Sequence, residues 1–153
     1  MVINGKILVP TDFSERSFEV LKRACVMASK FDAELHLLHV ITASTNFEAD
    51  LVSAIQLDEI KNAQFASASK RIAEQAASVD STVITHVEEA AADPALAICD
   101  YAREHAIDLI ITGRHSQQTA LEHMLIGSTA ERVVRYAPCS IFVVMPHGIL
   151  ADI

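Results

Sequence analysis

Two glycines bracket a polar segment that could hold a phosphate group. Gly113 follows the apolar run DLIIT, and Gly127 directly precedes Ser128 and a helix-like run. Glycine in such a loop permits positive φ and lets backbone N–H groups approach a phosphate without a Cβ in the way. A helix beginning at Ser128 would point the positive end of its dipole at the same place. The spacing therefore indicates a nucleotide site as one interpretation.

Polar side chains in and around this segment suit binding better than catalysis. The candidates for contact with a phosphate are Thr112, Arg114, His115, Ser116 and Ser128. No carboxylate is fixed by spacing beside His115 or His123, so neither histidine resembles a general base. We find neither a nucleophile–base pair nor a clear metal cage, and we predict no catalytic residue. Hydrolysis of a bound nucleotide would then depend on the ligand's own Mg²⁺.

The same residues also have a purely structural explanation. Ser128 and Glu131 form a capping box, in which the serine bonds the backbone three residues on and the glutamate reaches back. Gly127 would then serve only the turn before the helix. Both interpretations stay open at this point.

Composition excludes several classes of protein. The chain has 153 residues and a net charge of −8, which argues against nucleic acid as a partner because phosphate backbones need clustered Lys and Arg. No apolar run is long enough to span a bilayer, and the N-terminus lacks the features of a signal peptide. We expect one domain over residues 1–153, located in the cytoplasm. Three widely spaced cysteines predict buried small hydrophobes rather than disulfides or a zinc site.

The elements that must position the polar segment alternate between strand and helix. We predict strands at residues 6–10, 34–41, 82–87, 108–112 and 140–145, and helices at 14–31, 51–77, 94–105 and 128–137. This order predicts a parallel sheet with helices on both faces, because parallel strands need crossover connections. The buried stripe expected for the second helix is Ile60, Phe65, Ala68, Ile72 and Ala76.

Ligands in such sheets bind beyond the carboxyl ends of the strands, where the strand order reverses. The candidate loops are residues 11–14, the segment from Thr42, and residues 113–127. Asp12 and Ser14 in the first loop are both good helix N-cap types. Periodicity alone does not say which strands are neighbours.

Four sequence blocks together resemble the universal stress protein family. They are ILVPTDFSERS, LHLLHVI, DLIITGRHS and LIGSTAERVVRYAPCSIFVV, and the resemblance covers about residues 4–145. It implies an open, Rossmann-like, five-stranded parallel sheet in the order 3-2-1-4-5. Strands one and four would then be neighbours, and the Asp12 loop would face the Gly113 loop across one crevice.

The resemblance also implies an adenine nucleotide, ATP or AMP, with or without Mg²⁺. Asp12 would lie near the ribose or adenine, and Val40 would offer backbone groups to the adenine edge. The residues it implies at the nucleotide are Pro10, Thr11, Asp12, Val40, Thr112, Gly113, Arg114, His115, Gly127, Ser128 and Thr129.

The spacing of the glycines departs from the family's pattern. Nucleotide-binding members carry Gly, two residues, Gly, nine residues, Gly and then Ser or Thr. Gly113 and the Gly127–Ser128 pair match, but the middle glycine is absent. Ser116 stands there when counting forward and Gln117 when counting backward, because the loop is one residue longer. This departure affects the phosphate end more than the adenosine end.

Three functions follow from these observations. The leading expectation is a cytoplasmic stress-response protein that binds an adenine nucleotide and acts as a sensor or regulator. The second is a nucleotide-free member of the family that acts through protein partners. The third is a slow ATP hydrolase.

The last predicted strand indicates a homodimer. Residues 137–148 contain no Lys, Arg, Asp or Glu, and an apolar edge strand without charges tends to associate. We expect a two-fold partner strand running antiparallel, as the family resemblance also implies. The expected interface residues are Ile141, Phe142, Val143 and Val144. Otherwise the chain's own tail, residues 147–153, must cover the edge.

Overall fold

Five parallel strands form one sheet in the order β3-β2-β1-β4-β5. The computed structural model describes residues 5–42, 54–91, 93–114 and 128–145. The strands are β1 (Lys6–Pro10), β2 (Glu34–Thr42), β3 (Val83–Ala90), β4 (Leu109–Gly113) and β5 (Ser140–Val144). The expected topology is confirmed, and β1 and β4 are neighbours at the point where the strand order reverses.

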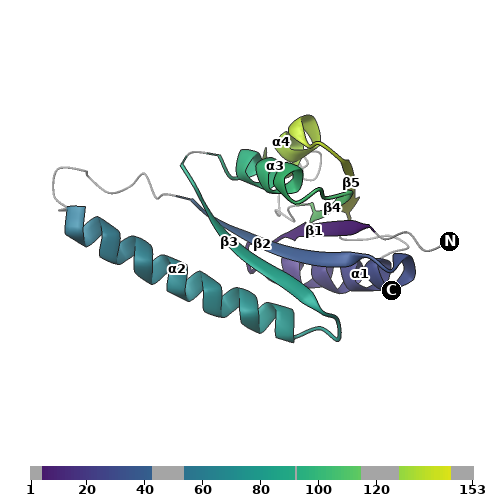
Figure 1. Cartoon of the computed structure of the whole chain (residues 1–153), viewed down its shortest axis with the longest axis horizontal. Helices are drawn as coiled ribbons and strands as arrows, with labels where there is room; N and C mark the ends of the chain where they lie inside the picture. The colour runs from purple at the N-terminus through teal and green to yellow at the C-terminus, as the bar shows by residue number, and fades with distance from the viewer. Residues whose placement is uncertain (1–4, 43–53, 92, 115–127, 146–153) are drawn as a thin grey trace, which may run out of the picture.

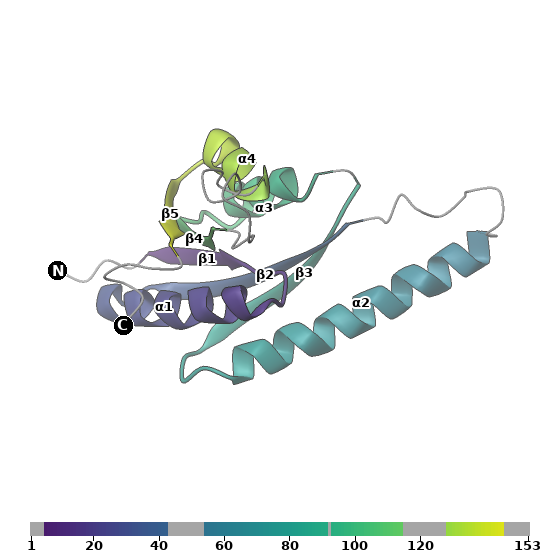
Figure 2. The ribbon, with the colours of Figure 1, turned by 180° about the vertical axis from the view of Figure 1, so that it is seen from behind.

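Four helices cover the two faces of the sheet in the described part of the chain. They are α1 (Glu15–Phe31), α2 (Ala54–Ala77), α3 (Pro94–Glu104) and α4 (Ser128–Tyr136). Figures 1 and 2 show α1 and α2 on one face and α3 and α4 on the other. Among the described helices, none is both long and apolar enough to cross a membrane.

The central strand β1 is buried on both faces, and its side chains divide between two cores. Ile7 and Val9 pack with α1 and α2, whereas Leu8 packs with α3 and α4. This division follows from the alternation of side chains along a strand. A strand covered by helices on both faces is expected to read as a continuous apolar run.

Two polar side chains cap the N-termini of α1 and α3 next to the carboxyl edge of the sheet. The Ser14 hydroxyl accepts a hydrogen bond from the Ser17 N–H at 3.2 Å and so caps α1. Asp93 caps α3 by accepting from the Ala95 N–H at 2.9 Å, with Pro94 as the first helical residue. Of the two N-cap candidates for α1, the cap is therefore Ser14 and not Asp12. The start of α4 at Ser128 agrees with the sequence prediction.

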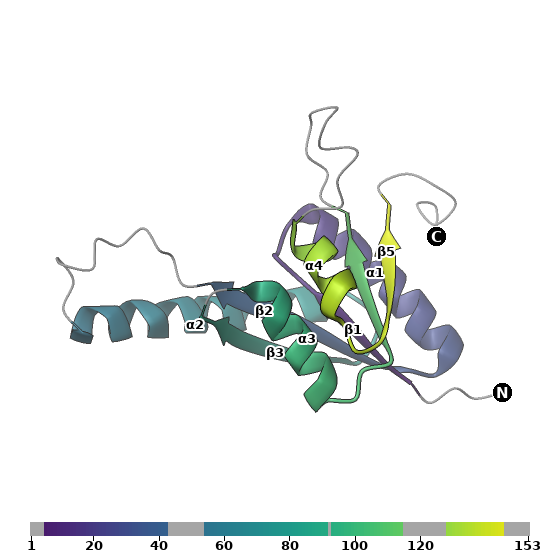
Figure 3. The same cartoon turned by 90° about the horizontal axis from the view of Figure 1, so that it is seen from above.

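Helix α2 departs from its predicted burial. Ala68 and Ile72 are buried as expected, but Phe65 is 45% exposed and Ile60 only half-buried. Figure 3 shows why: the N-terminal half of α2 extends past the sheet instead of lying on it. The apolar residues of α2 continue beyond the part of the helix that the sheet can cover. The predicted burial of Ile60 and Phe65 was therefore wrong. Residues 51–53, also predicted as helix, lie outside the described residues.

Strand β3 is longer than predicted, because its polar end still pairs with β2. The prediction ended at Val87, but Glu88, Glu89 and Ala90 continue the ladder opposite Val40, Ile41 and Thr42. Two glutamates are poor strand residues by propensity, and tertiary pairing overrides that preference at this sheet edge.

The three cysteines are free, and only Cys99 is fully buried. Cys25 and Cys139 are half-buried, which corrects the expectation that all three lie in the core. Burial raises the pKa of each thiol above its ordinary value. A raised pKa disfavours the thiolate, so these side chains are poor nucleophiles.

Candidate functional site

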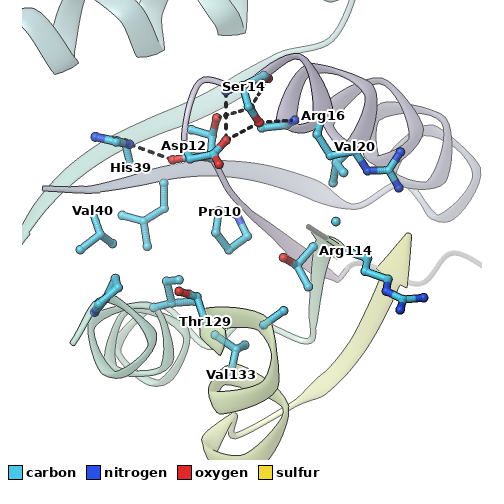
Figure 4. Close-up of a pocket in the computed structure, with 18 of the residues that line it drawn as sticks. Pro10, Asp12, Ser14, Arg16, Val20, His39, Val40, Arg114, Thr129 and Val133 are labelled. Atoms are coloured by element: carbon cyan, nitrogen blue, oxygen red, sulfur yellow. Dashed lines mark hydrogen bonds between the residues drawn. The ribbon is translucent and has the colours of Figure 1, made fainter. Parts of the chain in front are cut away.

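A cleft of about 680 Å³ opens at the carboxyl ends of β1, β2 and β4. Figure 4 shows residues of the loop after β1, the ends of β2 and β4, and helix α4 arranged around it. The position follows from the topology, because β1 and β4 are neighbours and the helices that come next, α1 and α4, lie on opposite faces of the sheet.

Most of the residues predicted from the sequence line this cleft. They are Pro10, Thr11, Asp12, Val40, Thr112, Gly113, Arg114 and Thr129. Ser128 is the first residue of α4, next to Thr129. His115 and Gly127, also predicted, lie outside the described residues.

The other lining residues were not named as site residues in the sequence analysis, although its candidate loops include Ser14 and Thr42. They are Ser14, Glu15, Arg16, Ser17, Val20, Leu38, His39, Thr42, Pro94, Ile98, Ala130 and Val133. Ser14, Arg16 and Ser17 stand in the same block as Asp12, and placing that block on a helix start at the crevice could have included them. Pro94 and Ile98 belong to α3, and only the fold brings them to the cleft.

The Thr11 side chain is committed to an internal cluster. Its hydroxyl donates to Oε1 of Gln75 in α2 at 2.8 Å and lies 3.0 Å from Oγ of Ser17. Gln75 is fully buried, and its amide nitrogen lies 3.5 Å from the same Ser17 oxygen. The hydroxyl hydrogen of Thr11 is therefore already used inside the protein.

Asp12 is exposed at the cleft and orients the cap of α1. Its Oδ1 accepts hydrogen bonds from the backbone N–H and the hydroxyl of Ser14, the former at 3.0 Å. The carboxylate is thus held in place beside the cleft by the residue that begins the helix. A fixed carboxylate at this position is suited to accept hydrogen bonds from ligand hydroxyl or amino groups.

His39 and Phe13 fix the conformation of the loop after β1. The Nδ1–H of His39 donates to the Thr11 carbonyl at 2.8 Å, and its ring lies 4.2 Å from the Phe13 ring, centroid to centroid. Phe13 has φ of 63°, which is uncommon for a residue with a Cβ. The Arg71 guanidinium of α2 lies 4.4 Å from the same ring. These contacts hold the loop in an otherwise unfavourable shape.

The end of β2 leaves backbone groups available at the cleft. The Leu38 carbonyl accepts a hydrogen bond from the Thr11 N–H at 2.8 Å, just past the last paired residues of β1 and β2. Backbone groups alternate in direction along a strand, so those of Val40 point to the same side as those of Leu38, past the end of β1. Leu38, Val40, Pro94 and Ile98 also give this end of the cleft an apolar lining.

Gly113 allows α1 to approach the end of β4. A Cβ at this position would lie 2.9 Å from Cγ2 of Val20 and 3.5 Å from Nε of Arg16. The described structure therefore explains this glycine by close packing against α1. The sequence argument had assigned it to phosphate approach, and the two explanations are compatible because Gly113 also lines the cleft.

Two arginines place positive charge at this end. The Val144 carbonyl accepts from the Arg114 N–H at 3.1 Å and from Nη2 of Arg16 at 2.8 Å. Burial lowers the pKa of Arg16 from its ordinary value, and Arg23 adds to this effect while Glu19 opposes it. A guanidinium stays charged in proteins despite such shifts. The cleft thus has an apolar end near Val40 and a cationic end near Gly113.

The described residues do not assemble a metal site. No group of three or more histidine, cysteine, aspartate or glutamate side chains among them could hold an ion.

Known proteins share this sequence and fold over nearly the whole chain. The sequence model described as the Universal stress protein family matches residues 4–145. A universal stress protein of Methanocaldococcus jannaschii is 34% identical, and the alignment covers 91% of this chain and 81% of the relative. The solved structure of universal stress protein UspA from Lactobacillus plantarum is 29% identical with a TM-score of 0.70, covering 92% of this chain and 97% of that one.

Two more distant structures hold nucleotides. A universal stress protein in complex with cAMP is 21% identical with a TM-score of 0.62, covering 95% of this chain and 99% of that one. The universal stress protein of Archaeoglobus fulgidus in complex with dAMP is 17% identical with a TM-score of 0.56, covering 94% of this chain and 98% of that one. At these identities the likeness shows the fold alone. The family match and the closer relatives show more: this chain belongs to the universal stress protein family.

Proposed function

We propose that this protein binds an adenine nucleotide, ATP or AMP, in the cleft and acts as a stress-response sensor or regulator. The observation that carries the proposal is the polarity of the cleft, apolar near Val40 and cationic near Arg114. A nucleotide has the same polarity, with a flat base at one end and phosphates at the other. Family members in complex with cAMP and dAMP support the choice of an adenine ligand.

The polarity also suggests how the nucleotide lies. The adenine sits against Leu38 and Ile98, with its edge on the backbone groups of Val40. The ribose lies beside Asp12, whose carboxylate accepts a hydroxyl hydrogen bond. The phosphates lie between Arg114 and the first turn of α4, where helix N–H groups attract anions.

The missing middle glycine does not exclude binding. A serine or glutamine at that position still has a backbone N–H, and it costs about 1 kcal/mol if left-handed geometry is required. Micromolar affinity corresponds to about 8 kcal/mol, so this loss alone would not abolish binding.

Two alternatives differ in what they predict. A family member without nucleotide would act through protein partners, which the altered glycine pattern favours. A slow ATP hydrolase would use Mg²⁺ brought by its ligand, because the described residues supply neither a metal cage nor a reactive thiol. A binding role for the cleft needs neither of these groups.

Calorimetry with ATP and AMP tests the proposal. We expect micromolar to sub-millimolar affinity, and loss of binding with retention of the fold when Gly127 is replaced by Val. The absence of heat with either nucleotide at millimolar concentration would refute the proposal and favour the partner-binding alternative. Mass spectrometry of the purified protein offers an independent check for a retained nucleotide. Phosphate release above a Ser128→Ala control would instead support the hydrolase.

We also propose that the protein forms a homodimer through β5. This strand pairs with β4 on one side, and its Ile141, Phe142 and Val143 are only half-buried in the single chain. Val144 is already buried by the chain's own core, so it contributes less than predicted from the sequence. A symmetric antiparallel partner would pair the free backbone edge. Sedimentation should give a dimer for the wild type and monomers or aggregates for Val143→Lys; a 16.6 kDa species alone would contradict the proposal.

A further inference from the structure

Arg16 reaches from the first turn of α1 to the cationic end of the cleft. Its Nη2 donates to the carbonyl of Val144, the last residue of β5, at 2.8 Å. Its Cγ and Nε lie 3.4 and 3.5 Å from the place that a Cβ on Gly113 would occupy. The guanidinium is therefore anchored beside Gly113 by one of its three nitrogens.

The Nε–H of Arg16 has no acceptor in the part of the chain that the structure describes. It is buried, and no hydrogen-bond partner is found for it among the described residues. Buried donors in folded proteins nearly always have a partner, so an unpaired one needs an explanation. Because the group is cationic and lines the cleft, the partner that fits best is an anionic oxygen from a ligand.

We propose that Arg16 binds the outer phosphates of the nucleotide and makes the cleft prefer ATP over AMP. This inference rests on the proposed nucleotide function. Nη2 keeps its bond to Val144, and a rotation about that bond turns the Nε edge toward a phosphate oxygen above Gly113. The planar fork of an arginine suits this contact, because two of its N–H groups can meet one phosphate.

The width of the sheet supports the choice of the outer phosphates. Val40, at the adenine end, lies on β2, and Val144, which anchors Arg16, lies on β5. Three strand spacings separate β2 from β5, which is about 14 Å. A chain of phosphates extends a nucleoside across such a distance, whereas the single phosphate of AMP stays closer to the ribose. Arg16, on α1, would thus bind a phosphate whether or not the loop has its middle glycine.

The test compares ATP, AMP and adenosine on three proteins by calorimetry at one ionic strength. The proteins are the wild type, Arg16→Gln and Lys22→Gln. Lys22 is the matched control, because it removes one positive charge from the same helix at an exposed position away from the cleft. We expect Arg16→Gln to weaken ATP binding about tenfold, which corresponds to about 1.4 kcal/mol. AMP and adenosine should change little, and Lys22→Gln should behave as the wild type.

The remaining outcomes separate the two proposals. An equal loss for all three ligands would mean that Arg16 only ties α1 to β5, and unchanged ATP binding would exclude contact with the phosphates. Failure of the wild type to bind any of the three would refute the nucleotide function, and this inference with it. If Arg16→Gln does not fold, Arg16→Lys provides the second variant: it keeps the charge, loses the fork, and should retain AMP binding while weakening that of ATP.

Discussion

The two walls of the cleft are built in different ways. On the β1 wall, residues 11–14 are held by other elements: Thr11 by Gln75 and His39, and Phe13 by Arg71 and His39. On the β4 wall, Gly113 packs against α1, and the Val144 carbonyl holds two arginine groups. One arginine donor on that wall, Nε of Arg16, has no hydrogen-bond partner among the described residues.

The difference suggests that the two walls bind different parts of the nucleotide. A wall whose polar groups are satisfied internally is rigid and offers shape and backbone groups, which suits a nucleoside. A wall with close packing and an unpaired cationic donor is suited to attract charge, which suits phosphates. The four substitutions that follow, from the largest expected effect to the smallest, test each wall separately.

Gly113→Ala should have the largest effect. The new Cβ would stand 2.9 Å from the buried Val20 side chain, so α1 must shift, at a cost of about 3 kcal/mol as for an overpacked core. ATP affinity should fall as well, because Arg16 moves with α1. Urea unfolding and calorimetry measure the two effects.

Gly5→Ala is the matched control for that substitution. Its Cβ would meet Asp108 Oδ2 at 3.5 Å, an ordinary contact, so stability should be nearly unchanged. Equal stability of the two variants would show that α1 is not packed as closely on β4 as described.

Gln75→Leu should destabilise the β1 wall. The buried hydroxyl of Thr11 would lose its bond to Gln75, and removing one partner of a buried hydrogen bond costs about 2 kcal/mol. Gln64→Leu, at an exposed position of the same helix, controls for the change of residue type. Calorimetry on Gln75→Leu gives a second comparison. The loosened loop should weaken the binding of adenosine and ATP equally, whereas Arg16→Gln should weaken that of ATP alone. If Gln75→Leu lowers neither stability nor affinity, the cluster does not hold the loop.

Much of this architecture could be predicted from the sequence, for physical reasons. Alternating apolar runs and caps located the elements, because periodicity and local hydrogen bonding act within a few residues. The prediction failed where long-range packing decides: Phe65 continues the apolar spacing of α2 but has no surface to cover. The strand order came from the family resemblance, since periodicity carries no information on which strands pair.

The site was predicted unevenly for the same reason. Gly113 was found from its place between an apolar run and a polar loop, whereas the family resemblance placed Asp12 at the nucleotide, and both residues line the cleft. Gln75, His39 and Arg16 act through contacts between separate elements, which no local spacing encodes. Thr11, which the resemblance places at the nucleotide, lines the cleft, but the fold uses its hydroxyl for Gln75.

Asp12→Ala should change affinity more than stability. The exposed carboxylate lies at the cleft, and loss of its contact with the ribose or adenine should weaken ATP and adenosine alike by about tenfold, or about 1.4 kcal/mol. Calorimetry and a melting curve on the same variant measure both effects. A lower melting temperature with unchanged affinity would mean that Asp12 serves only to orient Ser14.

Substitutions at Ser14 have the smallest expected effect. They distinguish two roles of its hydroxyl: capping α1 and bonding to the Asp12 carboxylate. Ser14→Ala removes the hydroxyl that caps α1 and should lower the free energy of unfolding by about 1 kcal/mol. Ser14→Gly should cost only a few tenths of a kcal/mol, because glycine is a tolerated N-cap residue. It also keeps the backbone N–H that donates to the Asp12 carboxylate. Chemical denaturation of the two variants gives the difference. Equal losses would show that the bond between the Ser14 hydroxyl and Asp12, rather than the cap, stabilises this start of α1.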